Sequence, residues 1–409
     1  MTMLRLLALV LFAAFLAPQT LRADPAFQTF LQSLWPEAAA RGISRPIFDA
    51  AINGLEPDLS LPDLIIPGRP DRAEPGQAEF VLTPADYLKE SSFTRLTAQG
   101  RKLAEQHRAT LAEIETQFGV PPQIVLAIWG RETSFGGYQL PYDAIRVLAT
   151  QSYLGRRKDM FRGEFLAALN MLQDGIPRAR MRSSWGGALG LTQFLPSEFY
   201  KFAVDFDGDG KIDIWTSVPD ALASAAKQLA GKGWQRGRAW AMEVRVPAKV
   251  DCTIADPDNL KPVGEWLKLG YIPVHGGIMS SEQLARPASL LMPAGTYGPS
   301  FLILRNYYVI KDYNFSDLYV LFVGHLADRI AGERPFRVSW QPVVQLHTKA
   351  LEDMQQHLST LGLYKDKIDG KAGMRTRLAL GAYQKSNSLK LDCWPTADVL
   401  THMQRKAAN

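Results

Sequence analysis

Two consecutive helical patterns constrain the fold of this 409-residue sequence more than any other feature. Residues 95–120 predict a long amphipathic helix, because four apolar side chains recur on one stripe: Leu103, Leu111, Ile114 and Phe118. The Pro121-Pro122 pair then begins a second helix, since proline is favoured in a first helical turn. This second helix is apolar until it reaches Glu132, just before a glycine-rich loop.

The rest of the sequence is helical on both sides of one region of strands. Residues 26–42, 141–235 and 316–332 have helical patterns, whereas residues 65–77 form a loop rich in proline and glycine. Short β-branched and aromatic segments predict strands at residues 240–250, 286–305 and 306–314. We therefore expect an α+β fold that is mainly α.

The first 23 residues have the pattern of a signal peptide. Arg5 precedes an apolar run at residues 6–17, and a polar segment ends at Ala23. The run is short for a membrane span, although an uncleaved anchor helix is the alternative. No cysteine lies near the cleavage region, so we do not expect a lipid anchor. The expected protein is exported, periplasmic and not a stable membrane protein.

The charge balance is mildly basic. The sequence has 46 Lys and Arg residues against 41 Asp and Glu residues, a net charge of +5. Removal of residues 1–23 would take away Arg5 and Arg22, leaving +5 − 2 = +3. This charge suits an anionic polymer, but no basic run with interleaved aromatic residues indicates nucleic-acid binding. We expect a monomer without an organic cofactor.

The two cysteines, Cys252 and Cys393, leave two alternatives open. An exported protein can form a disulfide between them, which would tie the end of the chain to its middle. The alternative is a pair of free thiols. The six histidines are scattered, and without an HExxH or CxxC motif they do not indicate a zinc site.

Glu132 is the candidate catalytic residue. Val125, Ile128 and Trp129 share its helix face, so the carboxyl group should be partly desolvated. Desolvation raises the pKa of a carboxyl group, and a protonated carboxyl can act as a general acid at neutral pH. The alternative is an ordinary solvated glutamate at a helix end.

Residues 182–199 have the composition of a cleft wall for a sugar chain. Small residues allow close approach of the backbone, and Ser184, Gln193 and Phe194 offer hydrogen bonds and an aromatic face. The glycine spacing does not match a dinucleotide-binding motif. The alternative is tight packing between a helix and a loop.

Residues 204–215 resemble the first half of a calcium-binding EF-hand loop. Asp205, Asp207, Asp209 and Asp213 stand at loop positions 1, 3, 5 and 9, and Lys211 would contribute its carbonyl oxygen. Position 12 is a threonine, so Asp220 would close a longer loop. We expect a structural Ca²⁺ or Na⁺; the alternative is a polar turn.

Residues 308–319 contain a polar and aromatic cluster, of which Tyr313, Asn314 and Tyr319 could line a binding cleft. The alternative is an ordinary turn between a strand and a helix.

Together these segments resemble the lytic murein transglycosylases of the membrane-bound B type. The resemblance rests, in order, on AIWGRETSFG, SWGGALGLTQFLPS, VDFDGDGKIDIWTSVPDALAS and YYVIKDYNFSDLY. It implies a lysozyme-like catalytic domain with a small β part around a cleft. It also implies cleavage of peptidoglycan glycan strands between N-acetylmuramic acid and N-acetylglucosamine, giving 1,6-anhydromuramoyl ends without consuming water.

The same resemblance assigns roles to the candidate residues. Glu132 matches the catalytic glutamate, which acts as acid and then as base. The positions that match substrate contacts are Ser184, Gln193, Tyr313, Asn314 and Tyr319. The metal-loop positions are Asp205, Asp207, Asp209, Lys211 and Asp220, the last one residue later than the family spacing.

The C-terminal residues are similar to a small three-helix peptidoglycan-binding domain. The similarity is carried by Asp369, Gly370, Gly373, Thr376 and Gln384. The expected organisation is a signal peptide at 1–23, a catalytic domain at 24–336 and a peptidoglycan-binding domain at 343–409. A helical cap without a ligand is the alternative for the last unit.

One carboxyl group is enough for the implied reaction. Glycoside hydrolysis uses two carboxylates, whereas the C6 hydroxyl of muramic acid can attack within the same molecule. A muramidase that hydrolyses the same bond, or a non-catalytic peptidoglycan-binding scaffold, are the alternative functions.

Overall fold

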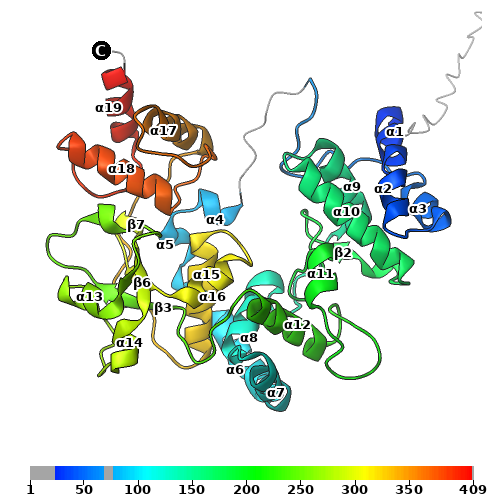
Figure 1. Cartoon of the computed structure of the whole chain (residues 1–409), viewed down its shortest axis with the longest axis horizontal. Coiled ribbons are helices and arrows are strands. Elements are labelled where there is room, and N and C mark those ends of the chain that lie inside the picture. The colour runs from blue at the N-terminus through cyan, green and yellow to red at the C-terminus, as the bar shows by residue number, and fades with distance from the viewer. Residues whose placement is uncertain (1–23, 69–76, 408–409) are drawn as a thin grey trace, which may run out of the picture.

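The computed structural model describes residues 24–68 and 77–407 and is mainly helical with two small antiparallel sheets in this part (Figure 1). This confirms the expected fold class. The signal-peptide pattern and part of the loop at 65–77 lie outside the described residues. Among the helices of the two described ranges, none combines the length and the apolar character that crossing a bilayer requires.

The N-terminal helices pack against a long helical pair, on the right of Figure 1. This helical unit, with its own apolar core, comprises α1 (Pro25–Ser33), α2 (Trp35–Ala40), α3 (Arg45–Ile52), α9 (Ala144–Leu154), α10 (Lys158–Gln173) and α11 (Pro196–Phe202). The helical pattern predicted at 26–42 is confirmed, although the helix is interrupted at Leu34. Pro36 has no N–H with which to continue the hydrogen-bond ladder.

The centre of the molecule surrounds the apolar helix α8 (Pro122–Thr133). Its neighbours are α6 (Glu90–Gln106), α7 (Arg108–Phe118), α12 (Val218–Gly231) and α16 (Asp317–Ile330). The long helix predicted at 95–120 is divided at His107, whose backbone is not helical. This break lets α6 pack on α16 while α7 packs on α12.

The β part is an antiparallel sheet with strand order β4-β6-β8-β3-β5. Its strands are β3 (Ala241–Arg245), β4 (Lys261–Pro262), β5 (Ile272–Pro273), β6 (Pro287–Leu291) and β8 (Ser300–Ile303). β7 (Pro293–Thr296) and the helices α13 (Val263–Lys268) and α14 (Ser281–Ala285) lie around it.

The strand predicted at 306–314 is wrong. Most of that segment is the helix α15 (Arg305–Lys311). Tyr307, Val309 and Ile310 are fully buried, so their β-branched and aromatic character reflects packing in the core and not an extended backbone.

The C-terminal module consists of α17 (Thr348–Thr360), α18 (Met374–Ser386) and α19 (Ala397–Ala407) around a separate apolar core. It lies over the β part and beside the short helices α4 (Ala78–Val81) and α5 (Pro84–Tyr87) (Figure 1). A disulfide joins Cys252, in a 3-10 turn next to the sheet, to Cys393 of the module, with the Cα atoms 6.1 Å apart. Of the two alternatives, the structure therefore contains the disulfide.

Candidate functional site

The abrupt end of α8 places Glu132. The chain leaves the helix through three consecutive residues with positive φ, Ser134, Phe135 and Gly136. The Phe135 ring folds back over Gly130, where a Cβ atom would lie 2.7 Å from the ring. Only glycine at position 130 therefore permits this turn, which leaves Glu132 in the last turn of α8.

The Glu132 carboxyl group is partly buried and hydrogen-bonded. The Tyr319 hydroxyl of α16 donates to Glu132 Oε1 at 2.5 Å. Burial raises the pKa of Glu132; the Tyr319 hydrogen bond and the Arg131 charge oppose this rise, while the Glu79 charge adds to it. A carboxyl group with a raised pKa keeps its proton closer to neutral pH, and so can donate it as a general acid.

Glu79 is a second carboxylate near Glu132 that the sequence analysis did not identify. It is 9% exposed, its Oε2 lies 3.9 Å from Arg131 Nη2, and its Oε1 accepts a hydrogen bond from Asn314 Nδ2 at 3.4 Å. Arg131 in turn donates two hydrogen bonds to the Tyr87 hydroxyl. Glu79 lies in a four-residue helix after a proline- and glycine-rich loop, and no local motif distinguishes it.

Ser184 and Gln193 stabilise the glycine-rich loop by local hydrogen bonds. Ser184 Oγ accepts from the Ala188 N–H at 3.2 Å, and Gln193 Nε2 donates to the Gly190 carbonyl at 3.0 Å. Gln193 has a φ of 59°, a left-handed conformation that is uncommon outside glycine. Both side chains are only partly buried, so the surface of this loop can still contact a ligand.

Two hydrogen bonds hold this loop beside Glu132. Thr133 Oγ1 donates to the Leu191 carbonyl at 2.8 Å, and the Tyr313 hydroxyl donates to the Thr192 carbonyl at 2.5 Å. The structure therefore brings together the end of α8, the glycine-rich loop and the turn at Tyr313 and Asn314.

Phe194 does not match its predicted role as a contact surface for sugar. Its ring is 1% exposed and belongs to the core of the N-terminal helical unit. Leu189 and Phe194 exchange two backbone hydrogen bonds of 2.8 Å, and this pairing turns the ring inward. Tyr319 is also 1% exposed, so its contribution is the hydroxyl group on Glu132.

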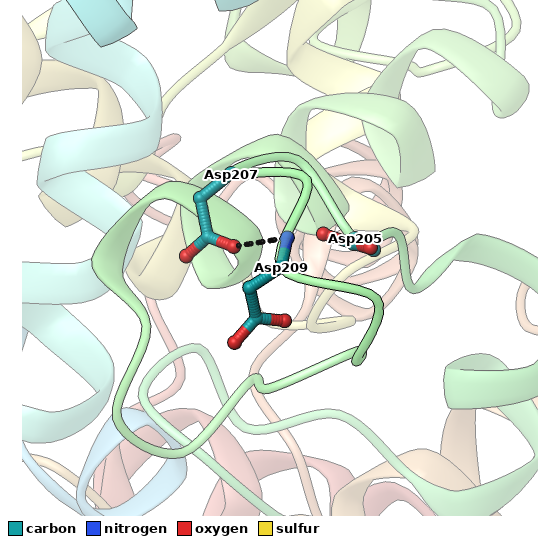
Figure 2. Close-up of side chains that lie close together, drawn as sticks. All are labelled: Asp205, Asp207 and Asp209. Carbon is teal, nitrogen blue, oxygen red and sulfur yellow. Dashed lines mark hydrogen bonds between the residues drawn. The ribbon is translucent and has the colours of Figure 1, made fainter.

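Three carboxylates of the aspartate-rich loop lie together, as the EF-hand spacing predicted. Oxygen atoms of Asp205, Asp207 and Asp209 lie within 4.8 Å of one another, and all three residues are exposed (Figure 2). Gly208 and Gly210 have positive φ and allow the tight turn. Carboxylate oxygens are the ligands that Ca²⁺ prefers, so the set fits a hard cation.

Asp220 is not part of this carboxylate cluster. It is fully buried, and its Oδ1 accepts from the Phe206 N–H while its Oδ2 accepts from the Asp213 N–H, both at 2.8 Å. Asp220 therefore joins the two ends of the loop through their backbones, which differs from the predicted direct contact with a metal. Lys211, whose carbonyl was predicted as a ligand, lies in the same exposed turn.

Comparison with known proteins identifies relatives of both parts of the chain. Residues 26–328 match the family described as Transglycosylase SLT domain, and residues 347–403 match the family described as Putative peptidoglycan binding domain. The membrane-bound lytic murein transglycosylase B of Escherichia coli (strain K12) is 33% identical over 219 residues. That match spans 52% of this chain and 58% of the relative.

Solved structures agree with the fold. SltB3 from Pseudomonas aeruginosa, in complex with NAG-anhNAM-pentapeptide, has a TM-score of 0.82 and 38% identity, over 92% of this chain and 99% of that one. The Escherichia coli lytic transglycosylase Slt35, in complex with calcium, shares the fold with a TM-score of 0.58 and 24% identity, over 76% of this chain and 95% of that one. Because the first family match covers most of the sequence, the chain belongs to the Transglycosylase SLT domain family.

Proposed function

We propose that this protein is an exported lytic transglycosylase that cleaves the β-1,4 bond between N-acetylmuramic acid and N-acetylglucosamine in peptidoglycan. The observation that carries the proposal is the partly buried Glu132, with a raised pKa and one hydrogen-bond donor, Tyr319, on its carboxyl group. The family of the chain and the relatives named lytic transglycosylases support the substrate class.

Glu132 acts twice in this mechanism. As the bond between muramic acid C1 and the glycosidic oxygen breaks, Glu132 gives its proton to the leaving oxygen. The C6 hydroxyl oxygen then bonds to C1, and its proton returns to Glu132. The step is intramolecular and consumes no water, so proximity of the C6 hydroxyl replaces an external nucleophile.

Glu79 is poorly suited to be the second carboxylate of a hydrolase. One oxygen faces Arg131 and the other accepts from Asn314, and the side chain is 7% exposed. A nucleophile or base that activates water must reach the sugar carbon or a water beside it. These contacts of Glu79 favour the transglycosylase reaction, in which Glu132 is the only carboxyl group that takes part.

Product analysis tests the proposal directly. Purified sacculi are digested in H₂¹⁸O by the wild type and by Glu132→Gln, and the released fragments are analysed by mass spectrometry. We expect wild-type fragments that are one water lighter than hydrolysis products and carry no ¹⁸O, and no release by the folded variant. Products labelled with ¹⁸O would identify a muramidase, and binding without release would identify a non-catalytic scaffold.

The aspartate-rich loop is proposed to hold a structural Ca²⁺ or Na⁺. Asp205, Asp207, Asp209 and the carbonyl of Lys211 would supply the oxygen ligands. A bound cation would offset the repulsion among these carboxylates and stiffen the loop that precedes α12. We assign it no part in bond cleavage.

The proposal also includes export of the protein and binding of its C-terminal module to peptidoglycan. The pattern at residues 1–23 would direct the chain to the periplasm, and the C-terminal module would bind peptidoglycan. N-terminal sequencing of protein from the periplasmic fraction tests the first part, since cleavage after Ala23 is expected. Sedimentation of the protein with sacculi tests the second.

A further inference from the structure

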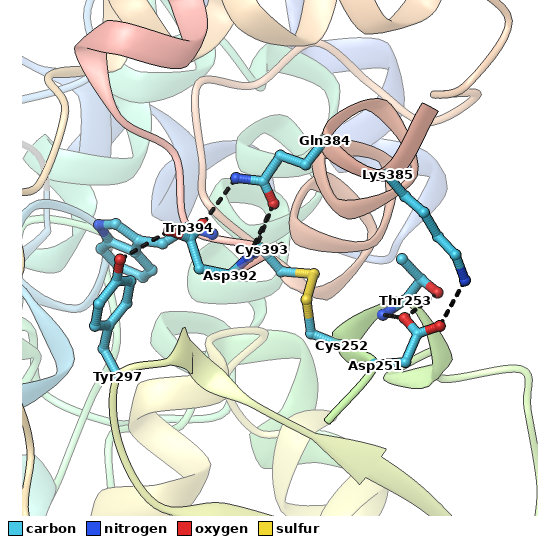
Figure 3. The surroundings of a disulfide bond; sticks show 9 residues. All are labelled: Asp251, Cys252, Thr253, Tyr297, Gln384, Lys385, Asp392, Cys393 and Trp394. Atoms are coloured by element: carbon cyan, nitrogen blue, oxygen red, sulfur yellow. Dashed lines mark hydrogen bonds and ion pairs between the residues drawn. A yellow bond between two sulfur atoms is a disulfide. The ribbon is translucent and has the colours of Figure 1, made fainter. Parts of the chain in front are cut away.

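Several contacts fix the C-terminal module to the β part. Besides the disulfide, Lys385 Nζ lies 2.6 Å from Asp251 Oδ2, and the Tyr297 hydroxyl donates to Asp392 Oδ2 at 2.7 Å (Figure 3). Gly381 permits the close approach of α18 to the turn that carries Cys252, because a Cβ atom at position 381 would lie 3.1 Å from Thr253 Cγ2. The module is thus packed on the catalytic part and not merely linked to it.

One further contact reaches a helix of the catalytic part. Arg377 Nη2 of α18 lies 3.2 Å from Asp317 Oδ2, at the start of α16, and both side chains are 8% exposed. A second guanidinium nitrogen of Arg377 donates to the Ala372 carbonyl within the module. This second bond holds the guanidinium in place, so the position of Asp317 depends on that of the module.

Asp317 is a buried carboxylate that is stabilised by neighbouring cations and hydrogen-bond donors. Burial alone would raise the pKa of Asp317, but Lys311 and Arg377, together with hydrogen bonds from Lys311 and Tyr307, lower it to about 2. The Lys311 ammonium lies 2.5 Å from Oδ1, and the Tyr307 hydroxyl donates to Oδ1 at 2.7 Å. Lys311 and Tyr307 thus both bind Oδ1, whereas Arg377 forms the ion pair with Oδ2.

The same helical turn carries the hydroxyl that holds Glu132. Tyr319 follows Asp317 by two residues, which is about 3 Å along a helix axis. Ser316 caps this turn and accepts hydrogen bonds from the Leu318 and Tyr319 N–H groups. A displacement of Asp317 therefore moves the backbone of Tyr319, whose hydroxyl makes the 2.5 Å bond to Glu132.

We infer that Arg377 of the C-terminal module is a positioning residue for Glu132, acting through Asp317 and Tyr319. The inference rests on the proposed function. It assigns the C-terminal module a role in the chemical step in addition to the proposed binding of peptidoglycan. Loss of Arg377 should loosen the first turn of α16, weaken the Tyr319 hydrogen bond and raise the pKa of Glu132.

Other charged and titratable groups also face Glu132, and the test has to separate their effects. Arg131 lies on its own helix, Glu79 on α4, Tyr87 on α5 and Tyr313 on the turn after α15. Removing a cation raises the pKa of a nearby carboxyl group even without any movement. A double-mutant cycle distinguishes this direct charge effect from an effect that passes through Tyr319.

The experiment compares Arg377→Met with Lys385→Met on a short soluble glycan oligosaccharide, which does not require surface binding. Lys385→Met is the matched control, because it removes an ion pair at the same interface that does not involve α16. We expect Arg377→Met to lower kcat roughly 3- to 20-fold, with KM nearly unchanged and the basic limb of the kcat profile shifted to higher pH. Arg377→Lys should restore part of the rate, and Lys385→Met should resemble the wild type.

The cycle with Tyr319→Phe decides the route. We expect Arg377→Met to add little to the loss of kcat, and no further pH shift, when Tyr319 is already phenylalanine. A full additional effect in that background would overturn the inference, as would an unchanged pH profile in Arg377→Met. An inactive wild type would instead contradict the proposed function. In that case the free energies of unfolding of the Arg377→Met and Tyr319→Phe single and double variants would still show, by their non-additivity, whether the two residues are coupled.

Discussion

The burial of Glu132 has a cost in stability that accompanies its proposed role as a general acid. Burial raises the pKa of Glu132 above its value in the unfolded chain, which is about 4.3. Protonated Glu132 therefore contributes fully to the free energy of unfolding at a pH below this unfolded value. The contribution is lost as the pH rises through the folded pKa, because a carboxylate must then be buried. A pKa that is higher by one in the folded state corresponds to about 1.4 kcal/mol in the free energy of unfolding.

We therefore predict that Glu132→Gln increases the free energy of unfolding at pH 8 relative to the wild type, with a smaller difference at pH 4. Urea denaturation at the two pH values measures this. The exposed Glu113→Gln serves as the control. A Glu132→Gln effect that is the same at both pH values would contradict a raised pKa.

Tyr319→Phe tests the hydrogen bond on the same carboxyl group. The Tyr319 hydroxyl lowers the pKa of Glu132, so its removal should shift the basic limb of the kcat profile to higher pH. We expect kcat at neutral pH to fall by about tenfold or more, since hydrogen bonds to charged groups contribute about 1.5–3 kcal/mol. Tyr308→Phe, whose hydroxyl bonds to Ser289, should leave the pH profile unchanged.

At the scale of elements, the aspartate-rich loop is the segment whose order should depend on a ligand. Asp205, Asp207 and Asp209 place like charges together at an exposed turn. A cation that binds only the folded loop stabilises the protein by about 2.7 kcal/mol at a concentration 100 times its Kd.

We predict that Ca²⁺ raises the Tm of the metal-free protein and that EDTA reverses the increase. The double variant Asp205→Asn/Asp209→Asn should lose the calcium-dependent part of the shift. Calorimetry in both conditions measures this. The same Tm with and without Ca²⁺ would exclude an ion that stabilises the fold.

At the scale of the whole molecule, the disulfide limits how far the C-terminal module can leave the catalytic part. Cys252 and Cys393 are separated by 141 residues and are each at most 2% exposed. A crosslink over so long a segment reduces the entropy of the unfolded chain by an amount worth about 4 to 5 kcal/mol at 25 °C in the loop-closure description.

We predict that Cys252→Ala/Cys393→Ala destabilises the docked module before the rest of the protein. The linker at residues 333–343 should become susceptible to limited proteolysis, and unfolding should separate into two transitions. The two single variants should behave like the double variant, since either one breaks the bond. One cooperative transition at the wild-type Tm would show that the noncovalent contacts suffice for docking.

Local patterns predicted much of the fold and part of the site. The apolar helix before Glu132, the glycine-rich loop and the aspartate spacing all occur in the structure as expected. The differences at His107 and at residues 306–314 occur where tertiary packing determines the backbone, whereas the interruption at Leu34 follows from the local effect of Pro36. Tyr307, Val309 and Ile310 show this clearly, because their burial in a helix produces the same composition as a strand.

The sequence by itself determined which chemical groups stand at the end of each local element: a carboxyl on an apolar helix, carboxylates in a turn, and two cysteines. These follow from helix periodicity and turn geometry, which act over a few residues. Only the tertiary structure decided their partners. Tyr319 meets Glu132 across 187 residues, and Asp317 meets Arg377 across 60. Such distant groups meet because buried surfaces pack and buried charges need partners, and no local spacing encodes that choice.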